Sequence, residues 1–253
     1  MRLDVYLTAS GDAKSRSYAA ELIKKGLVKV SGVVVTKPSF ETDGEGVEVT
    51  GELYPFVGRG GVKLEAALAS FSIDVAGKVC ADVGASTGGF TDCLLRRGAA
   101  KVYAVDSGHG QLDGTLAKDG RVVNLEGVNA KELSTVIEEE CAVCVCDVSF
   151  ISQTLLIPEI VKVLSDTGVF VTLIKPQFEV GKGAVGKGGI VKDKKSHADA
   201  IIKVADAASA CGLKLLALMP SPVPGGDGNR EFLAYFSRVG EEVSRDIVKE
   251  VTK

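Results

Sequence analysis

From residue 78 onward the chain alternates short apolar runs with amphipathic segments, and this alternation restricts the possible fold more than any other feature. Seven apolar runs are predicted as strands, at residues 78–83, 101–106, 121–125, 142–147, 168–174, 213–219 and 231–237. Helical periodicity falls between them, at 88–97, 110–118, 131–139, 152–164 and 196–211. Runs that are apolar throughout are typical of strands buried on both faces of a parallel sheet. The pattern predicts an α/β fold with a doubly wound, seven-stranded, mostly parallel sheet whose last two strands form an antiparallel edge.

The first fifty residues have a different pattern and predict a small α+β domain. Two short helical segments, the second at 18–25, precede short valine-rich strands around the Ser31-Gly32 turn. We expect Ser17 to cap the second helix and Gly26 to end it in a left-handed turn.

Residues 51–62 separate the two patterns. They contain one proline and four glycines, which is the composition of a linker. We therefore assign the small domain to residues 1–50 and the larger α/β domain to residues 63–253, which opens with a helix over 63–71.

Positive charge is concentrated near the N-terminus, although the whole chain has a formal net charge of -3. Between residues 14 and 29, five basic side chains stand against one acid, and most of the acids of this domain follow at 41–48. Because phosphate neutralisation drives most nucleic-acid affinity, Lys14, Arg16, Lys24 and Lys25 are candidate RNA contacts. The same pattern also fits a solvated pair of amphipathic helices. The glycine-rich, lysine-rich segment 182–195 is either a mobile loop over an RNA entrance or an ordinary surface loop.

The composition argues against a membrane protein and against a metal site. No apolar run approaches the roughly 20 residues that a membrane helix needs, and the N-terminus lacks a signal-peptide pattern, so we expect a cytoplasmic protein. Cys141, Cys144 and Cys146 are spaced like a metal knuckle, but a second pair is missing and His109 and His197 are the only histidines. We expect these cysteines to be buried strand residues, and no metal.

A glycine-rich loop follows the first predicted strand of the larger domain and opens a helix. Glycine lets a ligand approach the backbone closely, and the helix N-terminus supplies amide donors. The loop reads Gly84-x-Ser86-x-Gly88-Gly89, with Asp82 just before it. The next strand ends in Asp106, where an acid can accept hydrogen bonds from ribose hydroxyls.

This loop differs from the Gly-x-Gly-x-x-Gly pattern of nicotinamide enzymes. S-adenosylmethionine carries a sulfonium and an amino-acid end instead of a pyrophosphate, so an acid near the loop favours it as the cofactor. A glycine-rich strand–helix turn without a cofactor is the alternative.

Four chemically suitable residues stand at predicted strand or helix ends: Lys63, Asp147, Lys175 and Glu231. Methyl transfer to a ribose hydroxyl needs a partly deprotonated nucleophile, and a lysine acts as a base only where burial or a second cation disfavours its charged form. We predict Lys175 as the base and Lys63 as its positioning partner, with Asp147 and Glu231 fixing the two ammonium groups. Each of the four, taken alone, could equally belong to a surface ion pair.

Several of these motifs resemble those of a known family. They are residues 59–64, 82–90, 106–112, 147–152, 175–179 and 228–233, together with Arg2-Leu3-Asp4, Ser15-Arg16 and Gly26-Leu27-Val28. On these motifs the chain resembles the TlyA family of ribosomal RNA ribose methyltransferases, also called haemolysin A proteins. The larger domain resembles the FtsJ-type methyltransferase domain. The small one resembles the RNA-binding domain first seen in ribosomal small-subunit protein four.

The resemblance implies 2′-O-methylation of a cytidine in ribosomal RNA, with S-adenosylmethionine as cofactor and ribosomal RNA or ribosomal subunits as partner. Lys63, Asp147, Lys175 and Glu231 then fall on the Lys-Asp-Lys-Glu tetrad of related enzymes. The implied cofactor site comprises Asp82, Gly84, Ser86, Thr87, Gly88, Asp106 and, near the adenine, Asn129. The implied RNA-binding set adds Arg2 and Arg59 to the four basic residues named above.

Three other functions compete with this interpretation. A non-catalytic RNA-binding factor would have no use for paired lysines at strand ends, and a nicotinamide oxidoreductase is disfavoured by the loop. A membrane-active haemolysin, which the older family name suggests, is disfavoured by the absence of an export signal or a spanning helix. The sequence leaves open the modified nucleotide, the ribosomal subunit and the oligomeric state.

Overall fold

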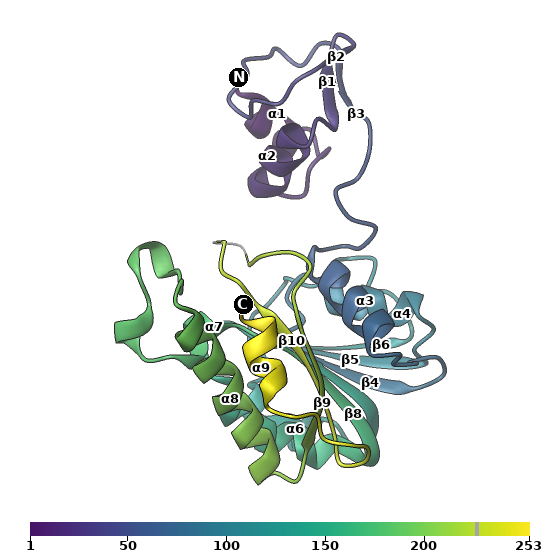
Figure 1. Cartoon of the computed structure of the whole chain (residues 1–253). Helices are drawn as coiled ribbons and strands as arrows, with labels where there is room; N and C mark the ends of the chain where they lie inside the picture. Colours follow the sequence, from purple (N-terminus) through teal and green to yellow (C-terminus); the bar gives the residue numbers. More distant parts are fainter. Residues whose placement is uncertain (226–227) are drawn as a thin grey trace. The chain divides into compact units, whose positions relative to one another are not determined.

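The structure is a computed structural model that describes residues 1–225 and 228–253. The chain forms two compact units, Met1–Pro55 and Phe56–Lys253, and each is described by itself (Figure 1).

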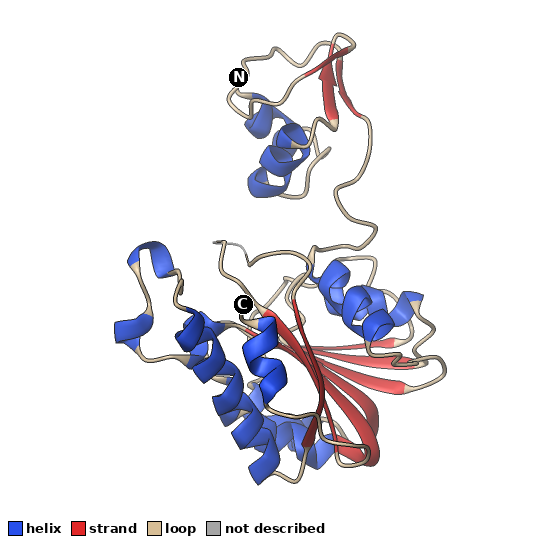
Figure 2. Cartoon of the chain, viewed as in Figure 1, coloured by secondary structure: helices blue, strands red, loops and turns tan. Residues whose placement is uncertain are grey.

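The N-terminal unit packs two helices against a three-stranded antiparallel sheet (Figure 2). Its elements are α1 (Leu3–Ala9), α2 (Arg16–Lys24), β1 (Val28–Val30), β2 (Val33–Val34) and β3 (Val47–Val49), with strand order β2-β1-β3. Leu3, Leu7, Leu22 and Ile23 form its core with Val28.

The turns of this unit lie where the sequence predicts them, but the N-cap of α2 is not the predicted residue. Ser31 and Gly32 both have positive φ, as the two-residue turn between β1 and β2 requires, and Gly26 ends α2 at φ 73°. The prediction of Ser17 as the cap was wrong. Ser15 is extended and its Oγ accepts the Tyr18 N–H at 3.2 Å, so α2 begins one residue before Ser17.

The second unit is built on a seven-stranded sheet with the order β6-β5-β4-β7-β8-β10-β9. The strands are β4 (Val79–Val83), β5 (Lys101–Asp106), β6 (Val122–Glu126), β7 (Cys141–Cys146), β8 (Leu164–Ile174), β9 (Lys214–Pro220) and β10 (Phe232–Ser237). The first five strands in this order are parallel, and β10 lies antiparallel between β8 and β9. The predicted doubly wound, mostly parallel sheet with an antiparallel edge is thus confirmed.

Helices cover both faces of this sheet (Figure 1). The helices α3 (Gly60–Ser70) and α4 (Gly89–Arg96) pack on one face, and α6 (Ile157–Val163), α8 (Lys194–Ala210) and α9 (Asp246–Val251) on the other. Successive strand residues pack on opposite faces of the sheet. Val171 packs toward α3 and α4, whereas Phe170 packs toward α6 and α8.

Short elements complete the unit. They are α5 (Leu133–Val136), α7 (Pro176–Glu179) and the 3₁₀ helices η1 (Ala130–Glu132), η2 (Gln153–Leu155), η3 (Lys182–Ala184) and η4 (Lys187–Gly189). The segment 182–195 thus contains two 3₁₀ turns and the start of α8. None of the described helices is long and apolar enough to cross a bilayer.

The predicted helix at 110–118 is absent, and residues 114–118 form turns instead. The Glu126 carboxylate accepts the backbone N–H groups of Gln111 and Leu112, at 2.6 and 3.0 Å. These two hydrogen bonds hold the start of the segment against β6. The helix predicted at 131–139 is also shorter, since only η1 and α5 form there.

The cysteines behave as expected. Cys141, Cys144 and Cys146 are free and fully buried in β7. Residues 1–225 and 228–253 contain no group of three or more side chains arranged to hold a metal ion.

Candidate active site

The glycine loop between β4 and α4 lies against the end of β7. Gly84 has φ 88°, and a Cβ there would lie 2.7 Å from the Asp147 backbone oxygen. Gly88, at φ 93°, caps α4 and leaves no room for a side chain beside Leu116 and Leu112. Glycine at these two positions therefore lets the loop approach both neighbours.

One predicted acid, Asp106, holds this loop, and another, Asp82, bonds the helix that follows it. The Asp106 carboxylate accepts the Ser86 N–H at 2.9 Å and the Gly108 N–H at 2.8 Å. Asp82 is completely buried and accepts the Thr91 hydroxyl at 2.6 Å, while its Oδ1 has no partner among the described residues. Burial raises the pKa of Asp82 to about 7.

A cavity of about 470 Å³ opens beside the loop. Five predicted cofactor or catalytic residues line it: Gly84, Ser86, Asp106, Asn129 and Asp147. In the described chain, the predicted residues Asp82, Thr87 and Gly88 lie next to this cavity without lining it. We call it the loop cavity.

The four predicted catalytic residues converge on a second cavity, of about 400 Å³. Lys63 comes from the first turns of α3, Asp147 and Lys175 directly follow β7 and β8, and Glu231 precedes β10. Because β10 runs antiparallel, its start lies at the same sheet edge as the carboxyl ends of β7 and β8. We call this space the tetrad cavity.

The tetrad forms two close ion pairs. Lys63 Nζ lies 2.5 Å from Glu231 Oε2, and both side chains are at least 95% buried. Lys175 Nζ lies 2.7 Å from Asp147 Oδ1 and donates a hydrogen bond to Ser149 Oγ at 2.9 Å. Each buried ammonium therefore has a carboxylate partner, as burial of a charge requires.

The two cavities share Asp147, Ser149 and Phe150. Phe150 is 91% exposed, has φ 65°, and its ring centroid lies 5.2 Å from that of Phe178. An exposed aromatic in the left-handed region is uncommon, and such residues cluster at functional sites. Ser149 and Phe150 were not predicted as site residues, because neither residue type indicates that it lines a cavity.

The loop that carries Phe150 is fixed at its far end. Gln153 donates to the Leu173 carbonyl at 2.6 Å and accepts the Thr172 hydroxyl at 2.7 Å. The buried Glu179 carboxylate accepts the Ser152 hydroxyl and the Gln153 N–H. The loop after β7 is therefore bound to β8 and α7.

Asn229 attaches another segment to the tetrad cavity. It is 1% exposed, its Nδ2 donates to the Gly189 carbonyl and its Oδ1 accepts the Val191 N–H, both at 2.9 Å. Because Gly189 lines the tetrad cavity, Asn229 holds part of the cavity wall.

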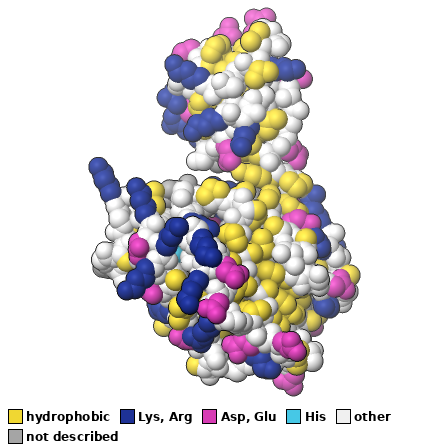
Figure 3. All heavy atoms as spheres, in the orientation of Figure 1, with side chains coloured by type: hydrophobic (Ala, Val, Ile, Leu, Met, Phe, Trp, Pro, Cys, Tyr) yellow, Lys and Arg dark blue, Asp and Glu magenta, His cyan; other side chains and the backbone are white. Residues whose placement is uncertain are grey.

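The predicted RNA-contacting residues fall in two places. Arg59 is exposed and lines the tetrad cavity. The other five, Arg2, Lys14, Arg16, Lys24 and Lys25, are exposed residues of the N-terminal unit. Figure 3 shows Lys and Arg side chains gathered on the face of this unit that carries α1 and α2.

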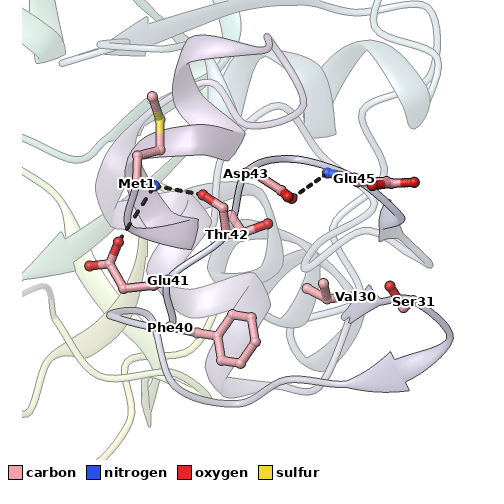
Figure 4. Close-up of a pocket in the computed structure, with 8 residues that line it drawn as sticks. All are labelled: Met1, Val30, Ser31, Phe40, Glu41, Thr42, Asp43 and Glu45. Carbon is pink, nitrogen blue, oxygen red and sulfur yellow. Dashed lines mark hydrogen bonds and ion pairs between the residues drawn. The ribbon is translucent and has the colours of Figure 1, made fainter.

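A different hollow of the N-terminal unit is acidic (Figure 4). It has a volume of about 460 Å³ and its lining includes Glu41, Asp43 and Glu45. The Met1 amine donates to the Thr42 carbonyl at 2.6 Å and pairs with Glu41 at 3.5 Å. This hollow contains none of the predicted RNA contacts, and its charge disfavours phosphate.

Comparison with known proteins shows two matching families. Residues 56–238 match the family of FtsJ-like methyltransferases, and residues 1–49 match the S4 domain.

Similar curated proteins match nearly end to end. "Hemolysin A" of Brachyspira hyodysenteriae is 46% identical over 93% of this chain and 99% of its own length. The "16S/23S rRNA (cytidine-2'-O)-methyltransferase TlyA" of Mycobacterium tuberculosis is 44% identical over 92% of this chain and 88% of its own. A solved structure from Streptococcus thermophilus, described as a hemolysin, is 38% identical with a TM-score of 0.80 and covers 100% of this chain and 94% of that one.

Proposed function

Because the chain belongs to the family of FtsJ-like methyltransferases and carries an S4 domain, we propose that it methylates the 2′-hydroxyl of a cytidine ribose in ribosomal RNA. The Mycobacterium tuberculosis relative is named for this reaction. The observation that carries the proposal is the pairing of Lys63 with Glu231 and of Lys175 with Asp147 beside the loop cavity.

We propose S-adenosylmethionine as the cofactor of the loop cavity. It supplies a methyl group made electrophilic by a positively charged sulfonium. The carboxylates of Asp106 and Asp147 line the cavity, so the donor set suits a cation. Asp106 would hold the ribose hydroxyls, the backbone of Gly84 and Ser86 the amino-acid end, and Asn129 the adenine.

The tetrad would remove the proton of the target hydroxyl. With RNA in the tetrad cavity, the 2′-hydroxyl would replace Ser149 as the hydrogen-bond partner of Lys175. An ion-paired ammonium is not a base, so RNA binding must first exclude water and favour the neutral amine. Once the Lys175 ammonium has released its proton to solvent, its neutral Nζ would accept the hydroxyl proton while the ribose oxygen takes the methyl group and the sulfonium becomes a neutral thioether; Asp147 would stabilise the ammonium that results.

The second ion pair would orient the substrate. Lys63 and Glu231 come from distant parts of the sequence, pair with each other, and both line the tetrad cavity. Phe150, exposed between the two cavities, would stack on the target base once it leaves its helical stack. Arg59 and the basic face of the N-terminal unit would neutralise phosphates of ribosomal RNA or of a ribosomal subunit. Such a substrate is consistent with a cytoplasmic protein.

The test is transfer of labelled methyl to purified ribosomal subunits, followed by mapping of the modified nucleotide. Lys175→Ala should abolish transfer, while calorimetric titration should show nearly unchanged affinity for S-adenosylmethionine and no binding of NAD. Lys162→Ala is the matched control, because Lys162 is exposed on α6 and pairs with Glu159. Full activity of Lys175→Ala would refute the assignment of the base. Absence of any transfer by the parent protein would favour a non-catalytic RNA-binding factor.

A further inference from the structure

The N-terminal unit contains a buried carboxylate that holds two exposed arginines. Asp4, in the first turn of α1, is 3% exposed. Arg2 donates to it through Nε and Nη2, both at 2.9 Å, and Arg16 donates through Nε at 3.0 Å. The side chains of Arg2 and Arg16 remain 43% and 60% exposed.

This arrangement joins two segments of the unit at one point. Arg2 directly precedes α1, whereas Arg16 begins α2. Each arginine uses its Nε for Asp4, and among the described residues the two terminal nitrogens of Arg16 have no hydrogen-bond partner. Neighbouring Lys14 lies over the Tyr18 ring, at 4.6 Å from its centroid. Several cations of the unit are therefore held in place by this unit's own side chains.

The carboxylate stays charged at any pH at which RNA is studied. The hydrogen bond from Arg2, reinforced by Arg16 and opposed by burial, lowers the pKa of Asp4 to about 2. A folded-state pKa below the ordinary value means that the stabilisation is present above about pH 4 and is lost only as the pH falls through about 2.

We propose that Asp4 is a positioning residue for RNA binding, which orders the Arg2 and Arg16 guanidinium groups before the phosphate backbone arrives. The inference rests on the proposed function, since it needs an RNA partner. A free arginine side chain loses rotamer entropy when it binds a phosphate, and a guanidinium already held on one side loses less. Asp4 itself touches no RNA.

The direction in which one substitution changes the affinity for RNA distinguishes this positioning role from a simple effect of charge. Asp4→Asn removes a negative charge close to the basic face. If charge alone mattered, affinity for RNA would rise, since a repulsive group is lost. If Asp4 positions the arginines, affinity falls, although the net charge of the unit becomes more positive.

The experiment measures binding of the full chain to purified ribosomal subunits over a salt series from about 50 to 200 mM. Asp4→Asn should weaken binding about tenfold. It should also reduce the slope of log K against log salt by the amount that corresponds to the loss of about one or two phosphate contacts. Asp12→Asn is the matched control: Asp12 is an exposed acid of the same unit whose carboxylate accepts the Ser10 hydroxyl. It should leave binding unchanged or slightly tighter.

Circular dichroism would reveal whether Asp4→Asn unfolds the N-terminal unit. If it does, a second variant tests the proposal. Arg2→Lys keeps the charge but cannot donate to Asp4 through two nitrogens. It should weaken binding about fivefold, whereas Lys37→Arg, on an exposed lysine of the same unit that is not among the predicted RNA contacts, should not. Equal binding by Arg2→Lys and the parent would overturn the proposal, as would unchanged or tighter binding by folded Asp4→Asn.

The two proposals fail in different ways. If the parent protein neither binds nor methylates ribosomal subunits, the proposed function is refuted and the role of Asp4 falls with it. If the parent binds and methylates but the Asp4 and Arg2 variants match it, only the role of Asp4 is refuted.

Discussion

Asp82 offers a direct test of the electrostatics beneath the glycine loop. Burial raises the pKa of its carboxyl to about 7, the Thr91 hydrogen bond opposes this, and the negative charges of Asp147 and Asp106 add to it. In the unfolded chain the same group titrates near 3.8. Between these values the folded chain holds a proton that the unfolded chain has released.

The size of the effect follows from the difference in pKa. At about 1.36 kcal/mol per pKa unit, the rise from 3.8 to about 7 corresponds to about 4 kcal/mol. Because the folded-state pKa is raised, this stabilisation is complete below about pH 3.8 and is lost as the pH rises through about 7. Between about pH 5 and pH 8, the free energy of unfolding should fall by about 3 kcal/mol on account of this one group.

Asp82→Asn removes the titration and tests the reasoning. Urea unfolding at about pH 5 and pH 8 would give the change in the free energy of unfolding for each protein. The parent should lose about 3 kcal/mol more than the variant over this range, because any cost of the amide itself is the same at both pH values. Asp166→Asn, on a fully exposed acid, should retain the parent profile. Parallel profiles for the parent and Asp82→Asn would refute the inferred ionisation.

Three further substitutions test the site. Gly84→Ala places a methyl group 2.7 Å from the Asp147 oxygen at positive φ, and should cost about 2–3 kcal/mol and weaken S-adenosylmethionine binding; a melting temperature equal to the parent's would contradict this. Asn229→Ala should cost about 1–3 kcal/mol and raise the Michaelis constant for RNA; unchanged proteolysis within residues 186–191 would argue against its holding role. Phe150→Ala should alter stability by less than about 0.5 kcal/mol yet slow methyl transfer about tenfold through lost stacking, and equal rates would count against the stacking role.

The strands of the sheet could be predicted because each of them is encoded by a short local stretch of sequence. Six of the seven strands begin and end within one residue of the predicted bounds, since each is a continuous apolar run next to a turn. The seventh, β8, begins at Leu164, earlier than its apolar run, because Leu164 already pairs with Cys141 before an irregularity in the ladder to β7. Antiparallel pairing of the last strand was also expected, but its position between β8 and β9 is a long-range property that periodicity does not encode.

The failures have the same origin. Turns replace the helix expected at 110–118, and the start of this segment is held by Glu126 of the next strand, a long-range contact that a local window does not contain. Residue type and strand-end position were enough to select the four tetrad residues. Which lysine pairs with which acid was not, because Lys63 and Glu231 are 168 residues apart.

The position of β10 has a consequence for synthesis of the protein. A nascent chain emerges from its N-terminus, so Lys63 leaves the ribosome long before Glu231. Until β10 has been made, β9 has no neighbour in the sheet and the Lys63 ammonium has no carboxylate partner. Methyl-transfer competence should therefore arise only once β10 has been made, and fragments truncated before β10 should be inert as well as unstable.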